Sequence, residues 1–353
     1  DELAFTRMIQ FMRLTDAKHS LSKKRCKMQY ILGIDVSKDK LDLVLITERG
    51  KFHKVISNNS EGYKALDKWL VSRQVEQVHA CLEATGQYGE EVAEHLYKQG
   101  HAVSVVNPAR IKHYGESKLH RNKTDKADAD LIAEFCLKEN PTLWQPLSPE
   151  IKHLRALVRR LEDLKTNCQQ EKNRLSSGEK DEWVVKDLST HVAYLETCIA
   201  ATEKEIQNFI KRTPNLKKQQ DLLNSIPGIA DKTSARLLAE IGDISTFESA
   251  SQLAAYAGLN PKGFSSGSSV HKKTRISKQG RRELRSCLYM PGIVASNHNP
   301  VVRSLKVRLH DRRLANKAII VAAMRKLLHI VYGVLKTQTP FDAEYHKQFN
   351  FSA

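Results

Sequence analysis

The order of the secondary-structure elements predicted for the first part of the chain constrains its fold most strongly. Short apolar segments with tight connections predict three strands, at residues 30–35, 41–47 and 51–57. The pattern then predicts a helix at 62–73, a buried strand at 78–83, a helix at 89–100, a buried strand at 102–107 and a helix from about Thr124. Three strands, helix, strand, helix, strand and helix is the order of a ribonuclease-H-like α/β fold. A doubly wound α/β sheet is the alternative.

Carboxylates stand at the ends of these predicted elements. Asp35 ends the first strand, and Glu83 ends the fourth within CLEATG. Asp125 and Asp128 lie three residues apart at a helix start and share a face, whereas Asp130 should point elsewhere. Because like charges that converge at a sheet edge need a cation, these four residues predict a Mg²⁺ site suited to phosphoryl transfer. The structural alternative is that the two aspartates complement the helix dipole and that Glu83 forms a salt bridge.

The charge of the chain predicts a polyanionic partner. Its 353 residues include 57 basic and 40 acidic side chains, a formal net charge of +17. Lys and Arg hold phosphates and release counterions on binding, so nucleic acid is expected before a membrane surface. Three basic residues lie just before the predicted helix that begins near Thr124. They are expected to contact nucleic-acid phosphates beside the metal site: Lys118, Arg121 and Lys123.

Cysteine spacing and hydropathy indicate the compartment. The six cysteines are scattered without a CxxC pair, which favours reduced thiols in a cytosolic protein over a zinc or redox motif. The sequence has no run of about 18 apolar residues, and its start lacks the apolar stretch of a secretory signal. We therefore expect a cytoplasmic protein with no membrane partner, associated with the nucleoid when active.

The middle of the chain has two apolar seams of heptad type. Their residues recur at steps of three and four: Leu154, Leu157, Leu161, Leu164 and Cys168, and then Leu188, Val192, Leu195, Ile199, Thr202, Ile206 and Phe209. Such seams predict an antiparallel helical hairpin, a coiled-coil dimer contact, or both.

Further on, residues 222–243 predict helix, tight PGI turn and helix, as in a helix-hairpin-helix that holds a DNA phosphate. Ala230 replaces the usual second glycine, so a corner that only packs is equally compatible.

The stretch GFSSGSSVHKKTR, residues 263–275, surrounds a glycine with four serines and then becomes basic. Glycine and serine predict a flexible loop, and nearby cations could hold a phosphate for attack by a serine. Ser268 and Ser269 are expected to contact phosphate. The basic residues around the stretch are predicted contacts for nucleic acid, although a solvated helix face is the alternative for the last of them: Lys262, Lys272, Lys273, Arg275, Lys278, Arg281 and Arg282.

Seven motifs in order together resemble one family, from about Tyr30 to about Phe341. They are GIDVSK, CLEATG, NKTDKADA, SIPGI, AGLNP, SGSS and YMP. The chain resembles the DEDD recombinases of bacterial insertion sequences in the IS110 group, which are related to the Piv pilin-gene invertases. Single motifs of this kind are weak, and their order and spacing make the resemblance specific.

The resemblance implies a fold, a site and partners. It implies an N-terminal extension at 1–28, a RuvC-like catalytic domain at 29–147, a coiled-coil insertion at 148–214, a mostly helical transposase domain at 215–345 and a tail at 346–353. The acidic tetrad falls on Asp35, Glu83, Asp125 and Asp128, and the catalytic serine on Ser266. Members close to this pattern are guided by a bridge RNA to target and donor DNA and act as dimers that assemble into tetramers.

The expected activity is cutting and rejoining of DNA through a covalent serine–DNA linkage, with Mg²⁺ held by the tetrad. Rejoining needs no ATP, and the sequence has no GxxxxGK loop to bind one. The rival enzymes are a RuvC-type junction nuclease, in which water attacks, and a Piv-like invertase without an RNA guide. A protein that only binds or shapes nucleic acid, with structural carboxylates, is the non-enzymatic rival.

Overall fold

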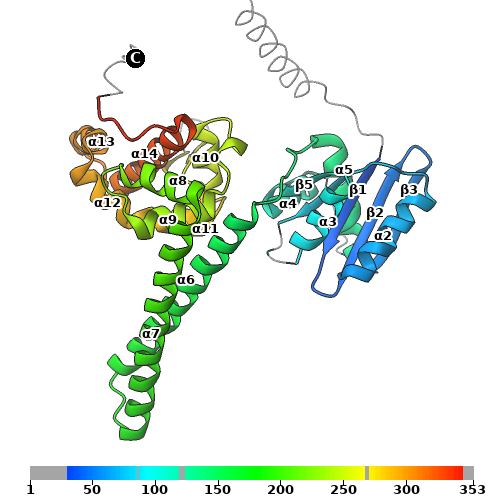
Figure 1. Ribbon diagram of the computed structural model, residues 1–353. Coiled ribbons are helices and arrows are strands. Elements are labelled where there is room, and N and C mark those ends of the chain that lie inside the picture. Colours follow the sequence, from blue (N-terminus) through cyan, green and yellow to red (C-terminus); the bar gives the residue numbers. More distant parts are fainter. Residues whose placement is uncertain (1–29, 85, 87, 119–123, 267–269, 345–353) are drawn as a thin grey trace, which may run out of the picture. The chain divides into compact units, whose positions relative to one another are not determined.

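The computed structural model describes residues 30–84, 86, 88–118, 124–266 and 270–344. The chain forms two compact units, one ending at Pro146 and the other beginning at Leu147 (Figure 1). The first unit is a mixed α/β sheet with helices, and the second is mostly helical. This architecture fits the predicted combination of a DEDD/RuvC-like domain with a helical region.

A five-stranded sheet with the order β3-β2-β1-β4-β5 forms the first unit. Its strands are β1 (Ile31–Val36), β2 (Lys40–Thr47), β3 (Gly50–Ser57), β4 (His79–Glu83) and β5 (Ala102–Val106). The first three strands pair antiparallel, whereas β4 lies parallel to β1 and β5 parallel to β4. Because parallel pairs need crossover connections, the helices between these later strands follow from the topology.

Helices cover both faces of the sheet. Residues of α2 (Ser60–Ser72) and α3 (Glu90–Lys98) share one apolar cluster with the sheet, and residues of α4 (Pro108–Ser117) and α5 (Asp125–Glu139) share the other. Helix α4 was not predicted from the sequence. Gly33 lets α5 approach β1, since a Cβ there would lie 2.3 Å from the Ala129 carbonyl oxygen. The glycine of the GID motif therefore fixes how closely α5 approaches the strand that carries Asp35.

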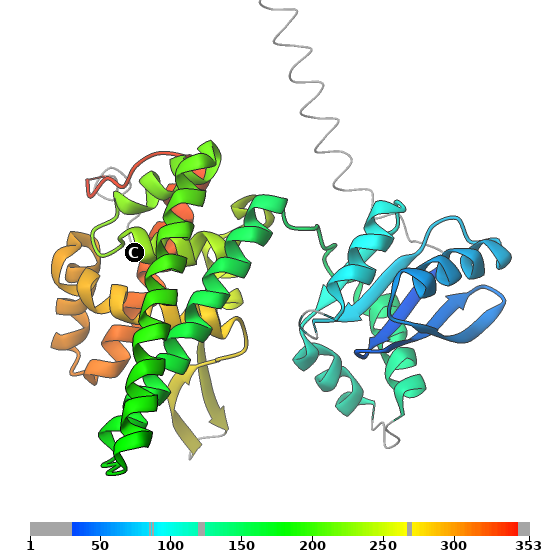
Figure 2. The ribbon, with the colours of Figure 1, turned by 60° about the horizontal axis from the view of Figure 1, so that its bottom comes forward.

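The predicted apolar seams form an antiparallel hairpin within one chain. Helices α6 (Pro149–Ser176) and α7 (Glu182–Arg212) pack along each other (Figure 2). Leu164, Cys168 and Leu195 form a small cluster of their own. Leu154 and Ile210 instead join the core of the helical unit, so the base of the hairpin is part of that unit.

The helical unit continues with α8 (Pro214–Asn224), α9 (Asp231–Ile241), a short 3-10 turn (Ile244–Thr246) and α10 (Ala250–Tyr256), and it ends with α11 (Arg282–Cys287), α12 (Tyr289–His298), α13 (Pro300–Asp311) and α14 (Asn316–Thr337). The PGI turn between α8 and α9 packs against α12, because a Cβ on Gly228 would lie 2.9 Å from Ala295. This contact favours the packing corner over phosphate binding.

Helix α14 is long and apolar enough to cross a membrane by length and composition, the only such helix among the described residues. Its apolar side chains, including Leu327, Leu328 and Val331, lie in the core of the helical unit. Helices α8, α10, α12 and α13 all pack against it. Core packing therefore accounts for its hydropathy.

On both sides of residues 267–269, the serine-rich stretch forms strands and not the flexible loop that its composition predicts. Strand β6 (Pro261–Ser266) pairs antiparallel with β7 (Val270–Ile276), and Ser266 stands opposite Val270 (Figure 2). Residues 267–269, including the predicted contacts Ser268 and Ser269, lie outside the described residues. The prediction was wrong because glycine and serine outweighed β-branched residues such as Val270 and Ile276, which favour strands.

Candidate active site and nucleic-acid interface

An acidic cluster lies where β1, β2 and the start of α5 meet. Asp35 near the end of β1 stands directly opposite Asp42 of β2, whose side chain is buried. Residues alternate between the two sheet faces, so Asp35 shares the face of Gly33, on which α5 packs. The cluster thus joins residues from two strands and the helix that covers them.

Negative charge is crowded around Asp35. Burial, followed by the charges of Asp128, Asp125 and Asp42, raises the pKa of its carboxyl from 3.8 to about 6. Both residues of the first turn of α5 therefore act on Asp35. Their placement follows from the helix start, where the side chain of Thr124 accepts a hydrogen bond from the Ala127 amide.

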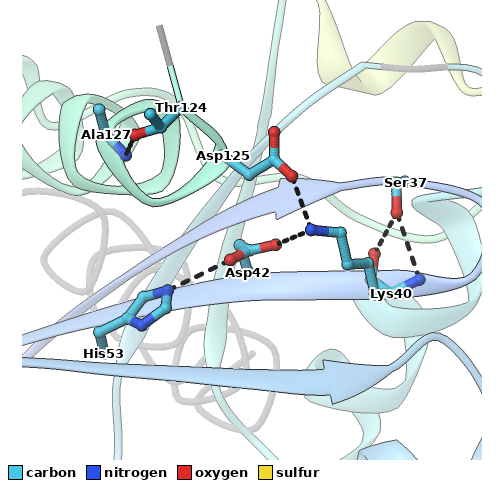
Figure 3. A network of polar contacts seen from close by, with 7 residues as sticks. All are labelled: Ser37, Lys40, Asp42, His53, Thr124, Asp125 and Ala127. Atoms are coloured by element: carbon cyan, nitrogen blue, oxygen red, sulfur yellow. Dashed lines mark hydrogen bonds and ion pairs between the residues drawn. The ribbon is translucent and has the colours of Figure 1, made fainter. Parts of the chain in front are cut away.

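Lys40 at the start of β2 lies between two of these carboxylates. Its Nζ is 2.6 Å from Asp125 Oδ2 and 3.2 Å from Asp42 Oδ2, and His53 Nε2 lies 3.2 Å from Asp42 Oδ1 (Figure 3). The hydrogen bonds to Asp125 and Asp42 raise the pKa of Lys40, so it remains charged. The ammonium group supplies the positive charge that this end of the sheet requires.

Glu83 lies on the strand next to Asp35. The parallel register pairs Gly33 with Cys81 and Ile34 with Leu82, so one step further brings Asp35 beside Glu83. By alternation both face α5, which is the placement expected for a tetrad. Among the described residues, however, no three His, Cys, Asp or Glu side chains are arranged so that they could hold a metal ion.

The donor set nevertheless suits a hard divalent cation. Carboxylate oxygens are the ligands that Mg²⁺ prefers, and burial together with three neighbouring carboxylates raises the pKa of Asp35. Asp125 is turned toward Lys40, which takes the position of a counterion. The chemistry of these residues suits a hard divalent cation, while the arrangement in this structure pairs Asp125 with Lys40.

Two other carboxylates on α5, those of Asp130 and Glu134, are already paired. Asp130 Oδ1 lies 2.6 Å from Lys51 Nζ, which confirms that it points away from Asp128. Glu134 accepts hydrogen bonds from Lys118 and Lys51, which lower the pKa of its carboxyl to about 2. Lys118, a predicted phosphate contact, thus has a partner in the protein. Arg121 and Lys123 lie outside the described residues.

The β6–β7 hairpin carries most of the other predicted contacts with nucleic acid. Lys262 and Arg275 are exposed and stand opposite each other in the register. Like charges in this arrangement repel, so an anion between them would stabilise the pair. Lys272 and Lys273 belong to β7, and Ser266 ends β6; the structure does not describe the side chains of these three residues. Lys278 and Arg282 are exposed.

Arg281 differs from its predicted neighbours. Its Nη1 lies 3.4 Å from Oε2 of Glu240, a buried residue of α9, and its guanidinium stacks over the ring of Tyr256. Arg155 of α6 donates from Nε to the Ala239 carbonyl oxygen at 2.8 Å. The charge of Arg281 is therefore already compensated inside the helical unit, where it links α9 to the segment before α11.

Sequence reasoning missed two residues of the acidic cluster, Asp42 and Lys40. The available signal was an aspartate within the otherwise apolar segment LDLVLIT, because a buried charge in a strand needs an explanation. The sequence could not indicate that Lys40 pairs with Asp125, which is distant in the chain.

Comparisons with known proteins cover nearly the whole chain. Residues 32–178 match the model of the DEDD transposase domain of the IS110 type, and residues 220–306 match that of the transposase IS116/IS110/IS902 family. The pilin gene-inverting proteins of Moraxella lacunata and Moraxella bovis are each 37% identical over 319 residues, which cover 90% of this chain and 98% of the relative. The transposase for insertion sequence element IS1111A of Coxiella burnetii is 26% identical over 364 residues, covering 91% and 94%.

Both matched families consist of transposases, and such DEDD enzymes are typically metal-dependent. The similarity to the pilin gene-inverting proteins extends over almost the full length of both chains. This chain therefore belongs to the IS110 family of transposases and recombinases, enzymes that act on DNA.

Proposed function

We propose that this enzyme is a site-specific DNA recombinase that cuts and rejoins strands through a covalent link between Ser266 and DNA. Asp35, Glu83, Asp125 and Asp128 would hold a magnesium ion, which stabilises negative charge on the reacting phosphate when it is bound. The observation that carries the proposal is the convergence of Asp35, Asp125 and Asp128 at one end of the sheet, where their charges act on one another.

The proposed step conserves the energy of the phosphodiester bond, because one phosphate ester is exchanged for another. A bond forms between Ser266 Oγ and phosphorus while the bond from phosphorus to a deoxyribose oxygen breaks, and the serine proton ends on that oxygen. Attack by a deoxyribose hydroxyl of another strand reverses the step and rejoins the DNA. The exposed Lys262 and Arg275 on the same hairpin support it, because they suit the phosphate on which the serine would act.

The RNA guide and the assembly are further parts of the proposal. We expect a bridge RNA to pair with target and donor DNA, and dimers to form a tetramer in which the acidic site of one subunit meets the serine of another. The hairpin of α6 and α7 is the proposed dimer contact, within domain limits of 29–147, 148–214 and 215–345. The expected location is the bacterial cytoplasm, at the nucleoid during reaction.

Site-specific inversion without an RNA guide is the second candidate. The similarity to the pilin gene-inverting proteins favours it, since these relatives cover almost the whole chain. Sequencing the RNA that co-purifies with the protein separates the two functions. An RNA that matches DNA flanking the gene supports guided recombination, and full activity after RNase treatment supports unguided inversion.

Replacement of the serine tests the central step. Ser266→Ala should abolish the protein–DNA adduct on denaturing gels and leave DNA binding intact, because only the attacking oxygen is removed. Ser265→Ala, the matched control, should form the adduct normally. An adduct that persists in Ser266→Ala rules out Ser266 as the nucleophile, and free 5′-phosphate ends without an adduct would instead indicate a junction nuclease.

Replacement of one acid tests the metal site. Asp128→Asn should slow adduct formation by about a thousandfold at saturating Mg²⁺, since stabilisation of the reacting phosphate is lost. Asp130→Asn removes a neighbouring carboxylate that is paired with Lys51 and should reduce the rate by less than about threefold. Equal rates for Asp128→Asn and the unmodified enzyme would mean that the carboxylates are structural.

A further inference from the structure

A second basic region lies at the end of the helical unit, outside the residues considered so far. Between Pro300 and Thr337 the only carboxylate is Asp311, opposed by nine basic residues. These are Arg303, Lys306, Arg308, Arg312, Arg313, Lys317, Arg325, Lys326 and Lys336. They occupy α13, α14 and the short connection between them, and the two helices pack against each other.

Part of this charge points into the protein without a partner. The Nε atom of Arg325 and the Nε2 atom of His329 are both buried and have no hydrogen-bond partner among the described residues. The two residues are four apart on α14, so they share one face of the helix. A buried polar atom left unpaired in this way costs free energy, so this face of α14 is not arranged for stability alone.

Lys326 and His329 show how strongly the cations act on one another. Burial lowers the pKa of Lys326, and the charge of Arg308 on α13 lowers it further. Burial likewise lowers the pKa of His329, with additional effects from Arg325 and Lys326. No carboxylate of the described residues forms an ion pair with Arg308, Arg325 or Lys326.

We propose that Arg308, Arg325, Lys326 and His329 form a binding site for a backbone phosphate of nucleic acid. A phosphodiester has two unbridged oxygens, which can accept hydrogen bonds from the Arg325 guanidinium and the Lys326 ammonium together. The anion would offset the repulsion within the cluster. Both DNA and RNA present this group, and Arg308 and the whole of α14 lie outside the residues 220–306 matched by the family model.

The site requires neither the serine chemistry nor the metal, so its test measures binding only. Arg325→Met, Lys326→Met and the double variant keep most of the side-chain volume and remove the charge. Affinity for mixed-sequence duplex DNA or single-stranded RNA should fall about tenfold for each residue, and the slope of log affinity against log salt should decrease by about one. Lys180→Met, an exposed residue before α7, removes the same charge and should change neither quantity.

The two nucleic acids distinguish the source of the phosphate. A loss confined to duplex DNA assigns the site to target or donor DNA, and a loss confined to RNA assigns it to a guide. Either result supports the site. An affinity and salt slope of the double variant equal to those of Lys180→Met would overturn it.

A second measurement distinguishes loss of the phosphate site from misfolding of a variant. Inorganic phosphate should raise the unfolding temperature of the unmodified protein and have a smaller effect on Lys326→Met, because it binds only the folded site. Arg308→Gln changes an exposed residue of α13 and leaves the core unaltered, yet it should reduce the same phosphate effect. Equal phosphate effects in all three proteins would contradict the proposal.

Discussion

The two units of the chain concentrate charges of opposite sign. At the end of the sheet, Asp35, Asp42, Asp125 and Asp128 crowd negative charge, and Lys40 forms ion pairs with two of them. On α13 and α14, Arg308, Arg325, Lys326 and His329 crowd positive charge without a carboxylate partner. The first region suits a cation and the second suits an anion, as expected of an enzyme that acts on DNA.

Paired charges elsewhere show what a structural cluster looks like. Glu134 is held by Lys118 and Lys51, and buried Glu240 is held by Arg281. In these clusters each charge has a partner of opposite sign, so they stabilise the packing of helices and need no ligand. Uncompensated charge is therefore a better indicator of a binding site than charge alone, and three substitutions can test this distinction.

Glu240→Gln should have the largest effect on stability. It removes the carboxylate that compensates Arg281 in the interior, next to Arg155. Breaking a buried ion pair costs about 3 kcal/mol of unfolding free energy, which chemical denaturation measures. Glu283→Gln removes an exposed carboxylate of α11 and should cost less than about 0.5 kcal/mol. A similar cost for both variants would mean that the buried pair has no special structural role.

Asp35→Asn should change the unfolding free energy in the opposite direction and stabilise the metal-free protein. The folded state holds the Asp35 proton more tightly than the unfolded chain, so ionisation destabilises the fold as pH rises from about 4 through about 6. Converted in full, the pKa shift of Asp35 corresponds to about 3 kcal/mol of unfolding free energy. Because the side chain is partly exposed, we expect a gain of about 1.5 kcal/mol at pH 7.

Denaturation in a chelator at several pH values measures this gain. It should vanish near pH 4, where Asp35 is protonated in the folded protein. Asp39→Asn, an exposed residue of the adjacent turn, provides the control and should show no such pH dependence. A loss of stability in Asp35→Asn at pH 7 would show that the negative charge at this site is compensated after all.

Lys40→Met should have the smallest effect, on metal affinity. Lys40 holds Asp125 through an exposed and therefore weak ion pair, so its removal should strengthen Mg²⁺ binding by only about two- to fivefold. Calorimetric titration with Mg²⁺ measures the change, and Lys38→Met in the same turn is the control. Weaker binding in Lys40→Met would show that Lys40 does not compete with the ion.

Much of the first unit could be predicted from the sequence because it depends on local patterns. Apolar segments and helical spacing indicated its five strands and, with the exception of α4, its helices. The positions of Asp35 and Glu83 at strand ends and of Asp125 and Asp128 in a first turn followed from the same patterns. The convergence of Asp125 and Asp128 on Asp35 agrees with that reasoning, while the roles of all four acids and of Ser266 remain predictions.

What only the tertiary structure decided depends on partners distant in the chain. Lys40 meets Asp125 across 85 positions and Arg281 meets Glu240 across 41, and no local pattern encodes such pairs. Residues 263–266 form part of a strand because β7 lies beside them, and the cations of α13 and α14 became a cluster because the helices pack together. The sequence by itself determined which charges the chain carries and in what order. The fold decided which of them are compensated, since compensation is a property of distance and burial.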